Sequence, residues 1–387
     1  MGFERELGKG FVFEANYTWN RGLHLWREFN ANAPVLPKGF TNFTQYLLSR
    51  DFTNLRACPD CSRPLFNGTG AGELVRFSLT SADPANPSAI GRIIEFGLPI
   101  SIINLNSIFG SNSASQLVAA RAAINSLRPD PARAEVEQLA SIGNSFYQGL
   151  VLELRRRFTR SPLGLGFSFR ASYTLSRLVD DGVVNTSDAL RPGDFRSERS
   201  RSLLDRRHRF AFSGTFELPG YLFKLRLSPI LRVSSGAPFN ISIGGVDRNL
   251  DDVNNDRPDF KGDLSRLRWR APGDPPDPSI LSLFSLPPIG TEGNLPRNAG
   301  VGPGQLLFDL NIQREFRFKD RMRLRPVLEI DNVLNQTVFS FGSEFIDFSA
   351  FSPTASAASR QAFLDSFLVT TRTLRPRAIR LGIRFDF

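Results

Sequence analysis

The chain has 387 residues, with 48 Lys or Arg against 38 Asp or Glu, which gives a formal net charge of +10. It contains no apolar run of about 18 residues, so a transmembrane helix is excluded, and the segment 1–7 lacks the basic and apolar regions of a signal peptide. A basic chain invites a nucleic-acid partner. Here the Arg residues are spread singly through the sequence rather than clustered, so we expect no nucleic-acid binding.

Apolar side chains recur at every second position in many segments, and this is the period of a β-strand. In the last segment, for example, Ile379, Leu381 and Ile383 alternate with Arg380 and Arg384. Taken along the chain, the pattern predicts nine strands, at residues 1–7, 10–29, 145–158, 164–176, 206–218, 222–244, 305–316, 321–335 and 373–387.

The connections between these strands alternate between short and long. Short turns are expected at residues 8–9, 159–163, 219–221 and 317–320, and long connections at about 30–144, 177–205, 245–304 and 336–372. Within the first long connection, the pattern also allows a further strand at 93–104 and a short helix at 114–126.

Such unequal ends favour one fold class. A soluble sandwich has short turns at both ends, whereas a membrane barrel has short periplasmic turns and long extracellular loops. The alternation therefore predicts an all-β fold, an antiparallel transmembrane β-barrel segment whose apolar face contacts outer-membrane lipid. The simpler alternative is an ordinary sheet whose Arg side chains face solvent.

In a barrel, the Arg residues of the alternating strands would face the lumen. The candidate lumen or ligand residues are Arg155, Arg170, Arg209, Arg226, Arg323, Arg325, Arg380 and Arg384. An unpaired buried charge is costly, so we expect these side chains to pair with carboxylates, namely Glu153, Glu217, Asp309, Glu329, Asp331 and Asp386.

Several stretches resemble TonB-dependent outer-membrane receptors, in particular the subgroup with an N-terminal carboxypeptidase-regulatory-like domain. They occur in the order of that family, at residues 2–7, 16–25, 144–158, 171–177, 205–210, 234–239, 255–259, 296–300, 329–336 and 376–385. Each stretch alone is a weak signal, and together they are fairly specific.

The resemblance implies a 22-stranded barrel around a plug, of which residues 1–387 form a C-terminal part. The segments 30–144 and 245–304 would be long extracellular loops. The plug, the regulatory domain and the energy-coupling box have no match here. An open sheet of nine strands would leave two unpaired edges in lipid.

The resemblance also implies partners and a function. The chain would lie in the cell outer membrane and take part in uptake of a scarce nutrient, such as a siderophore, an oligosaccharide or a peptide. The TonB energy-coupling complex would act only through the missing N-terminal part. The ending on Phe385 and Phe387 resembles the signal that the barrel-assembly machinery reads.

Two other classes of function stay open. The chain could be a small outer-membrane barrel or adhesin that displays its loops without active transport, or a soluble basic β protein that binds polyanions. A reading frame encoding a plug upstream of Met1 favours the receptor, and a signal peptide directly before Met1 favours the small barrel.

Other chemistry is sparse. The only histidines are His24 and His208, with no Ser or Cys partner, and we expect neither an enzyme nor a cofactor. Cys58 and Cys61 predict a disulfide in an extracellular loop, with a metal half-site or free thiols as alternatives. A weak calcium candidate has oxygen ligands at alternate positions, Asp247, Asn249 and Asp251, followed by Asp252. It lacks the Gly and Glu of a calcium loop, so we expect a solvated extracellular turn here rather than a calcium site.

Overall fold

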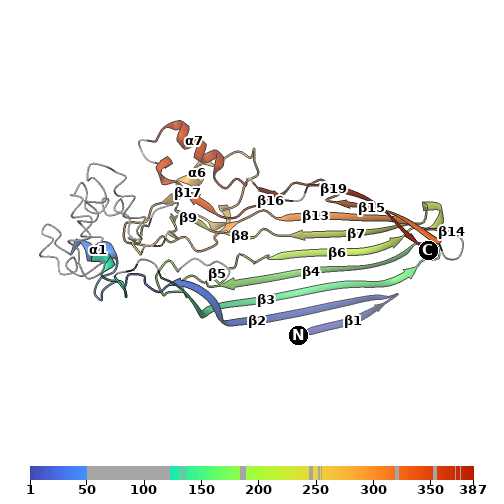
Figure 1. Ribbon diagram of the computed structural model, residues 1–387, viewed down its shortest axis with the longest axis horizontal. Helices are drawn as coiled ribbons and strands as arrows, with labels where there is room; N and C mark the ends of the chain where they lie inside the picture. The colour runs from blue at the N-terminus through green and yellow to red at the C-terminus, as the bar shows by residue number, and fades with distance from the viewer. Residues whose placement is uncertain are drawn as a thin grey trace.

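A computed structural model of the protein describes residues 1–49, 123–131, 133, 136–183, 189–243, 247–251, 253, 255–318, 322–351, 355–370, 372–374 and 376–387. An antiparallel sheet dominates these residues, and its long strands run side by side (Figure 1). The long strands are β1 (Gly2–Gly8), β2 (Phe11–Asn30), β3 (Glu137–Arg160), β4 (Gly166–Asp180), β6 (His208–Glu217), β7 (Leu225–Ser234), β13 (Gln305–Arg314), β15 (Met322–Asp331) and β19 (Ala378–Asp386).

These strands neighbour one another in chain order, so the sheet is an antiparallel meander. Two short strands extend it, β5 (Ser200–Arg201) beside β4 and β14 (Phe316–Phe318) beside β15. Within the described residues, β1 pairs only with β2 and β19 pairs only with β15, so these two strands are the edges of the sheet.

All nine predicted strands are present, and several of their limits differ from the prediction. The strand predicted at 222–244 ends at Ser234, because Gly236 lies against the Gly302 backbone, where a Cβ would be 1.8 Å from the carbonyl oxygen. The strand predicted at 321–335 ends at Asp331, because Asn332 and Asn335 have φ values of 51°. In the last segment, β18 (Arg372–Leu374) is separate from β19.

Two of the predicted strands are longer in the structure. The strand predicted at 145–158 is β3, which begins at Glu137, and the strand predicted at 164–176 is β4, which continues to Asp180. The connection between β2 and β3 therefore spans residues 31–136. The further strand at 93–104 and most of the helix at 114–126 lie outside the described residues.

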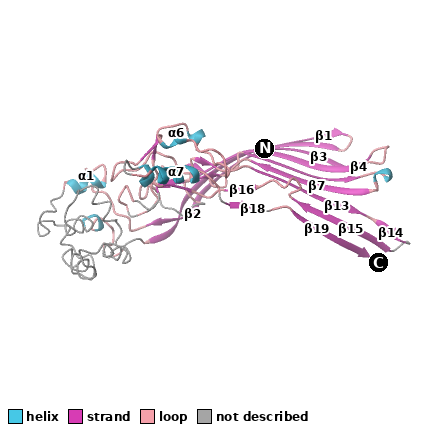
Figure 2. Cartoon of the chain, turned by 90° about the horizontal axis from the view of Figure 1, so that it is seen from above, coloured by secondary structure: helices cyan, strands magenta, loops and turns pink. Residues whose placement is uncertain are grey.

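The short elements belong to the long connections and the turns. They are α1 (Phe43–Leu48), η2 (Gly220–Leu222), β8 (Pro238–Phe239), β9 (Ile241–Ile243), β10 (Asp259–Phe260), η3 (Leu264–Arg266), α6 (Pro278–Leu281), β11 (Phe284–Ser285), β12 (Gly300–Val301), β16 (Val338–Ser340), β17 (Glu344–Ile346), η4 (Phe348–Phe351) and α7 (Ala357–Ser366). Most of them gather at the end of the sheet opposite the short turns (Figure 2).

The connections after β7 and β15 pack together into a unit that we call the loop cap, made of the described residues in 235–304 and 332–377. Strand β9 from the first connection pairs in parallel with β17 from the second. The hydrophobic core of the loop cap consists of the buried residues Phe239, Ile241, Phe260, Leu267, Ile280, Leu281, Phe284, Leu295, Ile346, Leu364, Phe367 and Leu368.

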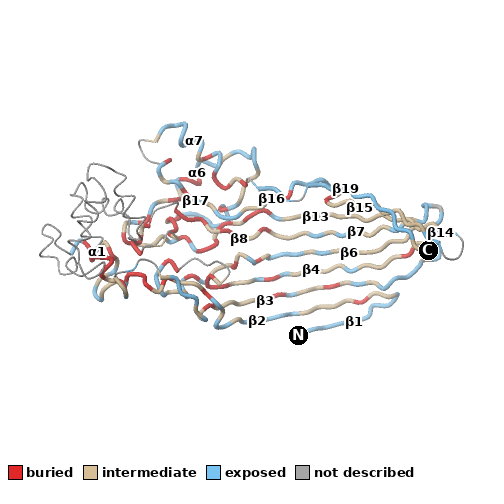
Figure 3. Tube along the Cα trace, viewed as in Figure 1, coloured by how far each residue is buried: buried red, intermediate tan, exposed pale blue. Residues whose placement is uncertain are grey.

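Burial differs sharply between the two parts. Buried residues concentrate in the loop cap and the neighbouring ends of the strands, while the long strands are half-buried or exposed along most of their length (Figure 3). On β19, Leu381 is 85% exposed and Ile383 is 76% exposed. No helix in the described part of the chain is both long and apolar enough to cross a membrane.

Candidate functional site

The register of the sheet places most polar residues of the nine long strands on one face. Glu14 lies opposite Glu153, Glu153 opposite Ser172, and Asn311 opposite Glu329. Directly opposed residues of antiparallel strands point to the same side. We call this side the polar face and the other the apolar face.

The apolar face forms a band of limited height. On β4 it runs from Phe167 to Leu175 and on β7 from Leu225 to Val233, always at alternate positions. A tilted transmembrane strand needs about 9–11 residues, so this band has the height of the hydrocarbon layer. Beyond it, towards the loop cap, the same side carries Arg177 on β4.

Arg side chains on the polar face pair with carboxylates of neighbouring strands. Near the N-terminal edge, Arg155 Nη2 lies 2.6 Å from Glu4 Oε1, and Arg170 Nη2 lies 2.7 Å from Glu153 Oε2. The first pair links β1 to β3 across β2, and the second joins the adjacent strands β3 and β4.

A second group of pairs lies near the short turns. Glu217 on β6 accepts hydrogen bonds from both Arg160, at the end of β3, and Arg226, on β7. At the C-terminal edge, Asp386 pairs with Arg325 and with Arg384, whose Nε lies 3.2 Å from Oδ1.

A third group lies towards the loop cap. Arg232 Nη2 on β7 is 2.6 Å from Asp309 Oδ2 on β13. Arg380 on β19 reaches both Glu329, with Nε 3.2 Å from Oε2, and Asp331, with Nη2 3.0 Å from Oδ2.

The eight predicted Arg residues therefore lie on one face, and the six predicted carboxylates all take part in ion pairs. Arg209 instead donates to the Leu204 carbonyl oxygen at 3.3 Å, and Arg323 lies opposite Asp386 in the register. Sequence reasoning missed Arg160 and Arg232. Arg232 has the same alternation as Arg226, which is the signal that could have found it. The lumen role of this face stays a prediction.

Two hollows open along the polar face. One, of about 690 Å³, lies near the short turns and has several basic side chains on its walls, including Arg160, Lys224 and Arg317. The other, of about 460 Å³, lies nearer the loop cap and is lined by two of the ion pairs, Arg232 with Asp309 and Arg380 with Asp331.

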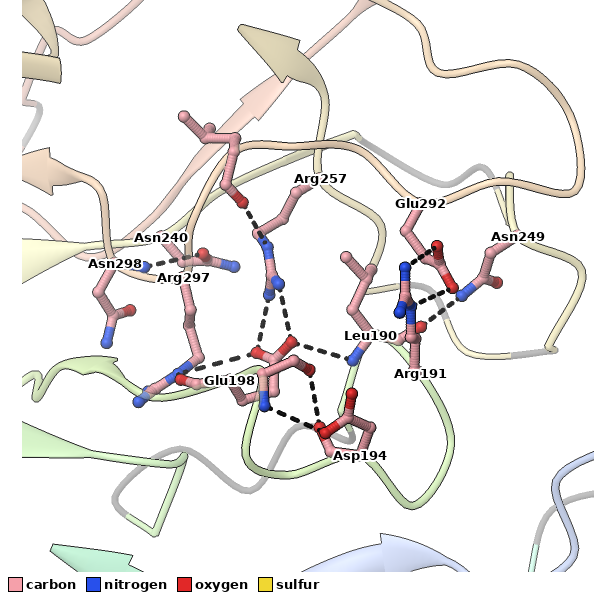
Figure 4. A network of polar contacts seen from close by, with 12 residues as sticks. Leu190, Arg191, Asp194, Glu198, Asn240, Asn249, Arg257, Glu292, Arg297 and Asn298 are labelled. Atoms are coloured by element: carbon pink, nitrogen blue, oxygen red, sulfur yellow. Dashed lines mark hydrogen bonds and ion pairs between the residues drawn. The ribbon is translucent and has the colours of Figure 1, made fainter. Parts of the chain in front are cut away.

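Figure 4 shows a buried polar network in which Glu198 lies between Arg257 and Arg297. Through Asp180, this network joins the loop cap to the sheet. Arg257 donates to both carboxylate oxygens of Glu198, at 2.9 and 2.8 Å, and to the Leu295 carbonyl oxygen at 2.8 Å. We call the network formed by Asp180, Glu198, Arg257 and Arg297 the latch.

Arg297 completes the latch at the sheet. Its Nη2 donates to Asp180 Oδ1 at 2.5 Å and to the Asp180 carbonyl oxygen at 2.8 Å, while its Nε donates to the Glu198 carbonyl oxygen at 3.1 Å. Asp180 is the last residue of β4, Glu198 lies in the connection after β4, and both Arg residues lie in the connection between β7 and β13. The latch therefore holds three separate segments together.

The surroundings of Glu198 in the latch favour its charged form. Burial alone would raise the pKa of Glu198, but the hydrogen bonds and positive charge of Arg257 outweigh it, so this pKa lies below its ordinary value. Sequence reasoning missed these four residues as a group. Arg257 and Arg297 do lie in two of the receptor-like stretches, 255–259 and 296–300, and this was the signal available.

The weak calcium candidate is a tightly folded acidic turn. Asp247 Oδ1 accepts from the Leu250 amide at 2.7 Å, Asn249 Oδ1 from the Asp251 amide at 3.1 Å, and Asp251 Oδ1 from the Val253 amide at 2.9 Å. No group of three or more His, Cys, Asp or Glu in the described residues has the geometry to hold a metal ion. Asp252 lies outside the described residues, as do Cys58 and Cys61.

The expectation of a solvated turn is wrong, because the acidic turn is buried. Asp251 is 1% exposed and Asp256 is 0% exposed. Burial, with the nearby charge of Asp247, raises the pKa of Asp256 to about 7 and raises that of Asp251 well above its ordinary value.

The remaining predicted residues lie at the surface. His208 is the first residue of β6, and its Nδ1 is 2.7 Å from the hydroxyl of Tyr173 on β4. Phe385 and Phe387 are 47% and 94% exposed, with ring centroids 5.9 Å apart at the end of β19. Their role as an assembly signal stays a prediction.

An antiparallel sheet with one apolar face, one charged face and a large cap at a single end defines a class, the β-structured proteins of the outer membrane. A family model described as "Outer membrane beta barrel domain" matches residues 1–363. The chain belongs to this family, and it is an outer-membrane protein.

Among solved structures, the chain is similar to the outer membrane transporter YddB from Escherichia coli, with 7% sequence identity and a TM-score of 0.42. The match covers 100% of this chain and 32% of the transporter, so the chain spans about a third of that protein. No curated protein matches the sequence.

Proposed function

We propose that the chain is the C-terminal barrel part of a TonB-dependent receptor that takes up a scarce nutrient across the outer membrane. In this proposal the polar face lines the lumen of a larger barrel, which an N-terminal part of the receptor completes. The proposal assigns no catalytic role and no cofactor to the chain.

The observation that carries the proposal is the polar face itself. Its ion pairs connect strands from one edge of the sheet to the other, from Glu4 with Arg155 to Arg384 with Asp386. Charged side chains at such density need water or a polar partner beside them, and a lumen supplies both. The opposite face carries an apolar band of membrane height.

The latch supports the receptor subgroup over a simple barrel. Four of the receptor-like stretches contribute buried residues to the region where the strands meet the loop cap, namely Asp205, Arg257, Arg297 and Asn332. Asn298, for instance, donates from Nδ2 to the Arg201 carbonyl oxygen at 2.8 Å. Four of these stretches thus contribute buried residues at the same end of the sheet, which supports a shared architecture.

In this proposal, a ligand approaches from the side of the loop cap. Long loops of outer-membrane barrels are extracellular and short turns are periplasmic, so a ligand would arrive at the loop cap. It would then meet the hollow of about 460 Å³ bounded by Arg232, Asp309, Asp331 and Arg380. This hollow presents both charges, so a ligand rich in hydrogen-bonding groups is the class it fits best.

The test is uptake in cells that produce the complete gene product. Growth on a panel of limiting nutrients is compared between a deletion strain and the complemented strain, with and without an active TonB complex. The proposal predicts that one nutrient restores growth only with the receptor and TonB together. Growth that is independent of TonB on every nutrient contradicts it.

An immunoblot of separated membranes distinguishes the receptor from the loop-displaying barrel. An antibody against residues 247–259 should detect a band in the outer membrane much larger than the 43.2 kDa of this chain. A band of 43.2 kDa that shifts on boiling would instead favour the small barrel.

A further inference from the structure

The apolar face carries Arg side chains without a carboxylate partner, in contrast to the polar face. Arg314, the last residue of β13, lies opposite Leu225, the first residue of β7. Its guanidinium carbon lies 4.4 Å from the centroid of the Phe316 ring, and no described acidic residue forms an ion pair with it.

Arg314 stands at the end of a hollow on the apolar face. The hollow has a volume of about 670 Å³ and lies over β13, β15 and β19, which are adjacent in the sheet (Figure 1). Its walls include Leu225, Ile312, Pro326, Leu328, Leu381 and Ile383. The Pro326 ring reaches less far from its strand than the Leu and Ile side chains around it, which leaves room above β15.

The position of Arg314 along the strand matters for its charge. A charged residue on the lipid face costs about 2–4 kcal/mol at the bilayer midplane and about 0–1 kcal/mol near the interface. Arg314 lies near the short-turn end of the apolar band, since its partner Leu225 begins β7 and the aromatic residues Phe316 and Phe318 of β14 follow it on the same face. The guanidinium is therefore at headgroup depth.

We propose that this hollow binds one phosphate-bearing lipid of the leaflet at the short-turn side. One acyl chain lies against Leu328, Leu381 and Ile383, and Arg314 donates hydrogen bonds to the phosphate. A guanidinium matches phosphate oxygens in geometry and charge. A volume of about 670 Å³ falls within the roughly 300–1,000 Å³ of small-molecule sites.

Arg156 provides a matched comparison on the same face. It lies opposite Phe11, the first residue of β2, and its guanidinium carbon is 3.5 Å from the Phe167 centroid. Its Nε and Nη1 atoms are buried without a hydrogen-bond partner. It shares the charge of Arg314 and lies on the same face, but it does not line the hollow, so it tests whether charge alone retains lipid.

The experiment measures lipid retained by the complete protein after extraction from outer membranes into a mild non-ionic detergent. Native mass spectrometry counts the bound phospholipids, and the shift in gel migration on boiling checks that each variant is folded. The variants are Arg314→Gln, Arg314→Lys, Pro326→Leu, which fills the hollow, and Arg156→Gln as the control.

We expect the Arg314→Gln variant to retain about tenfold less of one phospholipid. The reason is that the substitution removes a hydrogen bond between a charged group and the phosphate. Arg314→Lys should retain an intermediate amount, Pro326→Leu should lose the lipid, and Arg156→Gln should keep it. Unchanged retention in Arg314→Gln and Pro326→Leu overturns the proposal, as does equal loss in Arg156→Gln. If Arg314→Gln does not fold, Pro326→Leu decides the outcome.

A competition separates lipid from soluble anion. Added short-chain phosphatidylglycerol should displace the retained lipid, whereas inorganic phosphate at the same concentration should not. Displacement by inorganic phosphate alone would identify a soluble-anion site and overturn the proposal.

Discussion

The sheet and the loop cap use apolar residues in opposite ways. In the loop cap, Phe239 and Ile241 are 0% exposed and pack into a core. On the sheet, Leu381 is 85% exposed and belongs to an apolar face without any described layer over it. One part folds by burying apolar surface from water, and the other uses the membrane as its solvent. Mutations of similar chemistry should therefore have different effects in the two parts.

The largest effect is expected for Phe239→Ala. Truncation of a fully buried Phe costs about 3–5 kcal/mol, and Phe239 also contacts Phe341 with ring centroids 4.3 Å apart. The rate of proteolysis within the loop cap, measured in detergent, should rise strongly. Leu381→Ala is the matched control, because its side chain contacts lipid rather than protein, and it should change neither proteolysis nor the temperature of unfolding appreciably. Equal sensitivity of the two variants would refute the comparison.

Glu198→Gln should loosen the loop cap by a similar or slightly smaller amount. Removal of one charge from a buried ion pair costs about 3–5 kcal/mol, since the other charge stays buried. Arg257 and Arg297 are 7% and 3% exposed. Proteolysis between residues 189 and 205 reports the loss.

Glu292→Gln is the control for this prediction. It removes the pair with Arg191, whose side chain is 62% exposed, and such pairs contribute at most about 1 kcal/mol. If both substitutions had the same small effect, the latch would not hold the cap to the sheet.

A change of pH is expected to have an intermediate effect on the stability of the loop cap. Because the pKa of Asp256 is raised to about 7, the folded cap binds this proton over a range where the unfolded chain has lost it. Stability of the loop cap should therefore fall as the pH rises from about 4 to about 7 and then level off. Asp247 and Arg248 are the charges that act on Asp256 most directly.

Asp256→Asn should flatten this pH dependence. The amide oxygen can still accept from the Arg248 and Asn249 amides, as Asp256 Oδ2 does, and Asp251 would retain part of the slope. Thermal unfolding of the loop cap at several pH values measures this pH dependence. A wild-type cap that becomes more stable between pH 4 and pH 7 would contradict the assignment.

The smallest effect is expected on the polar face. A double-mutant cycle with Glu153→Gln and Arg170→Gln should give a coupling of about 0.2–1 kcal/mol, since the Arg170 side chain is 68% exposed. Heat-induced unfolding in detergent at low and high salt provides the measurement. A coupling that is unaffected by salt would indicate that the pair is shielded from water.

The strands could be predicted from the sequence because their signal is local. Alternation within about ten residues identifies β4 or β19 and assigns Arg170 and Arg380 to one face. The predicted ends of the strands were less accurate where a contact with a distant part of the chain determines them. The end of β7 is an example, because Gly236 lies against the backbone of Gly302.

The loop cap and the latch could not be predicted, because their contacts join distant segments. Glu198 and Arg257 are 59 residues apart, and Asp180 and Arg297 are 117 residues apart. No periodicity links such positions, and a lone Arg in a Pro- and Asn-rich connection has the same local pattern as a solvated one. The burial of Asp251 and Asp256 was missed for the same reason.

The most direct test of the account is cysteine accessibility along β13 in isolated outer membranes, in a background with Cys58 and Cys61 replaced by Ser. Single cysteines would replace each residue from Leu306 to Gln313. We predict that a membrane-impermeant maleimide labels the odd positions, such as Asp309 and Asn311, once the membranes are opened, whereas brominated lipid quenches a probe at Phe308 and Leu310. Uniform labelling of both sets would contradict the assignment of one face to lipid and the other to a polar lumen.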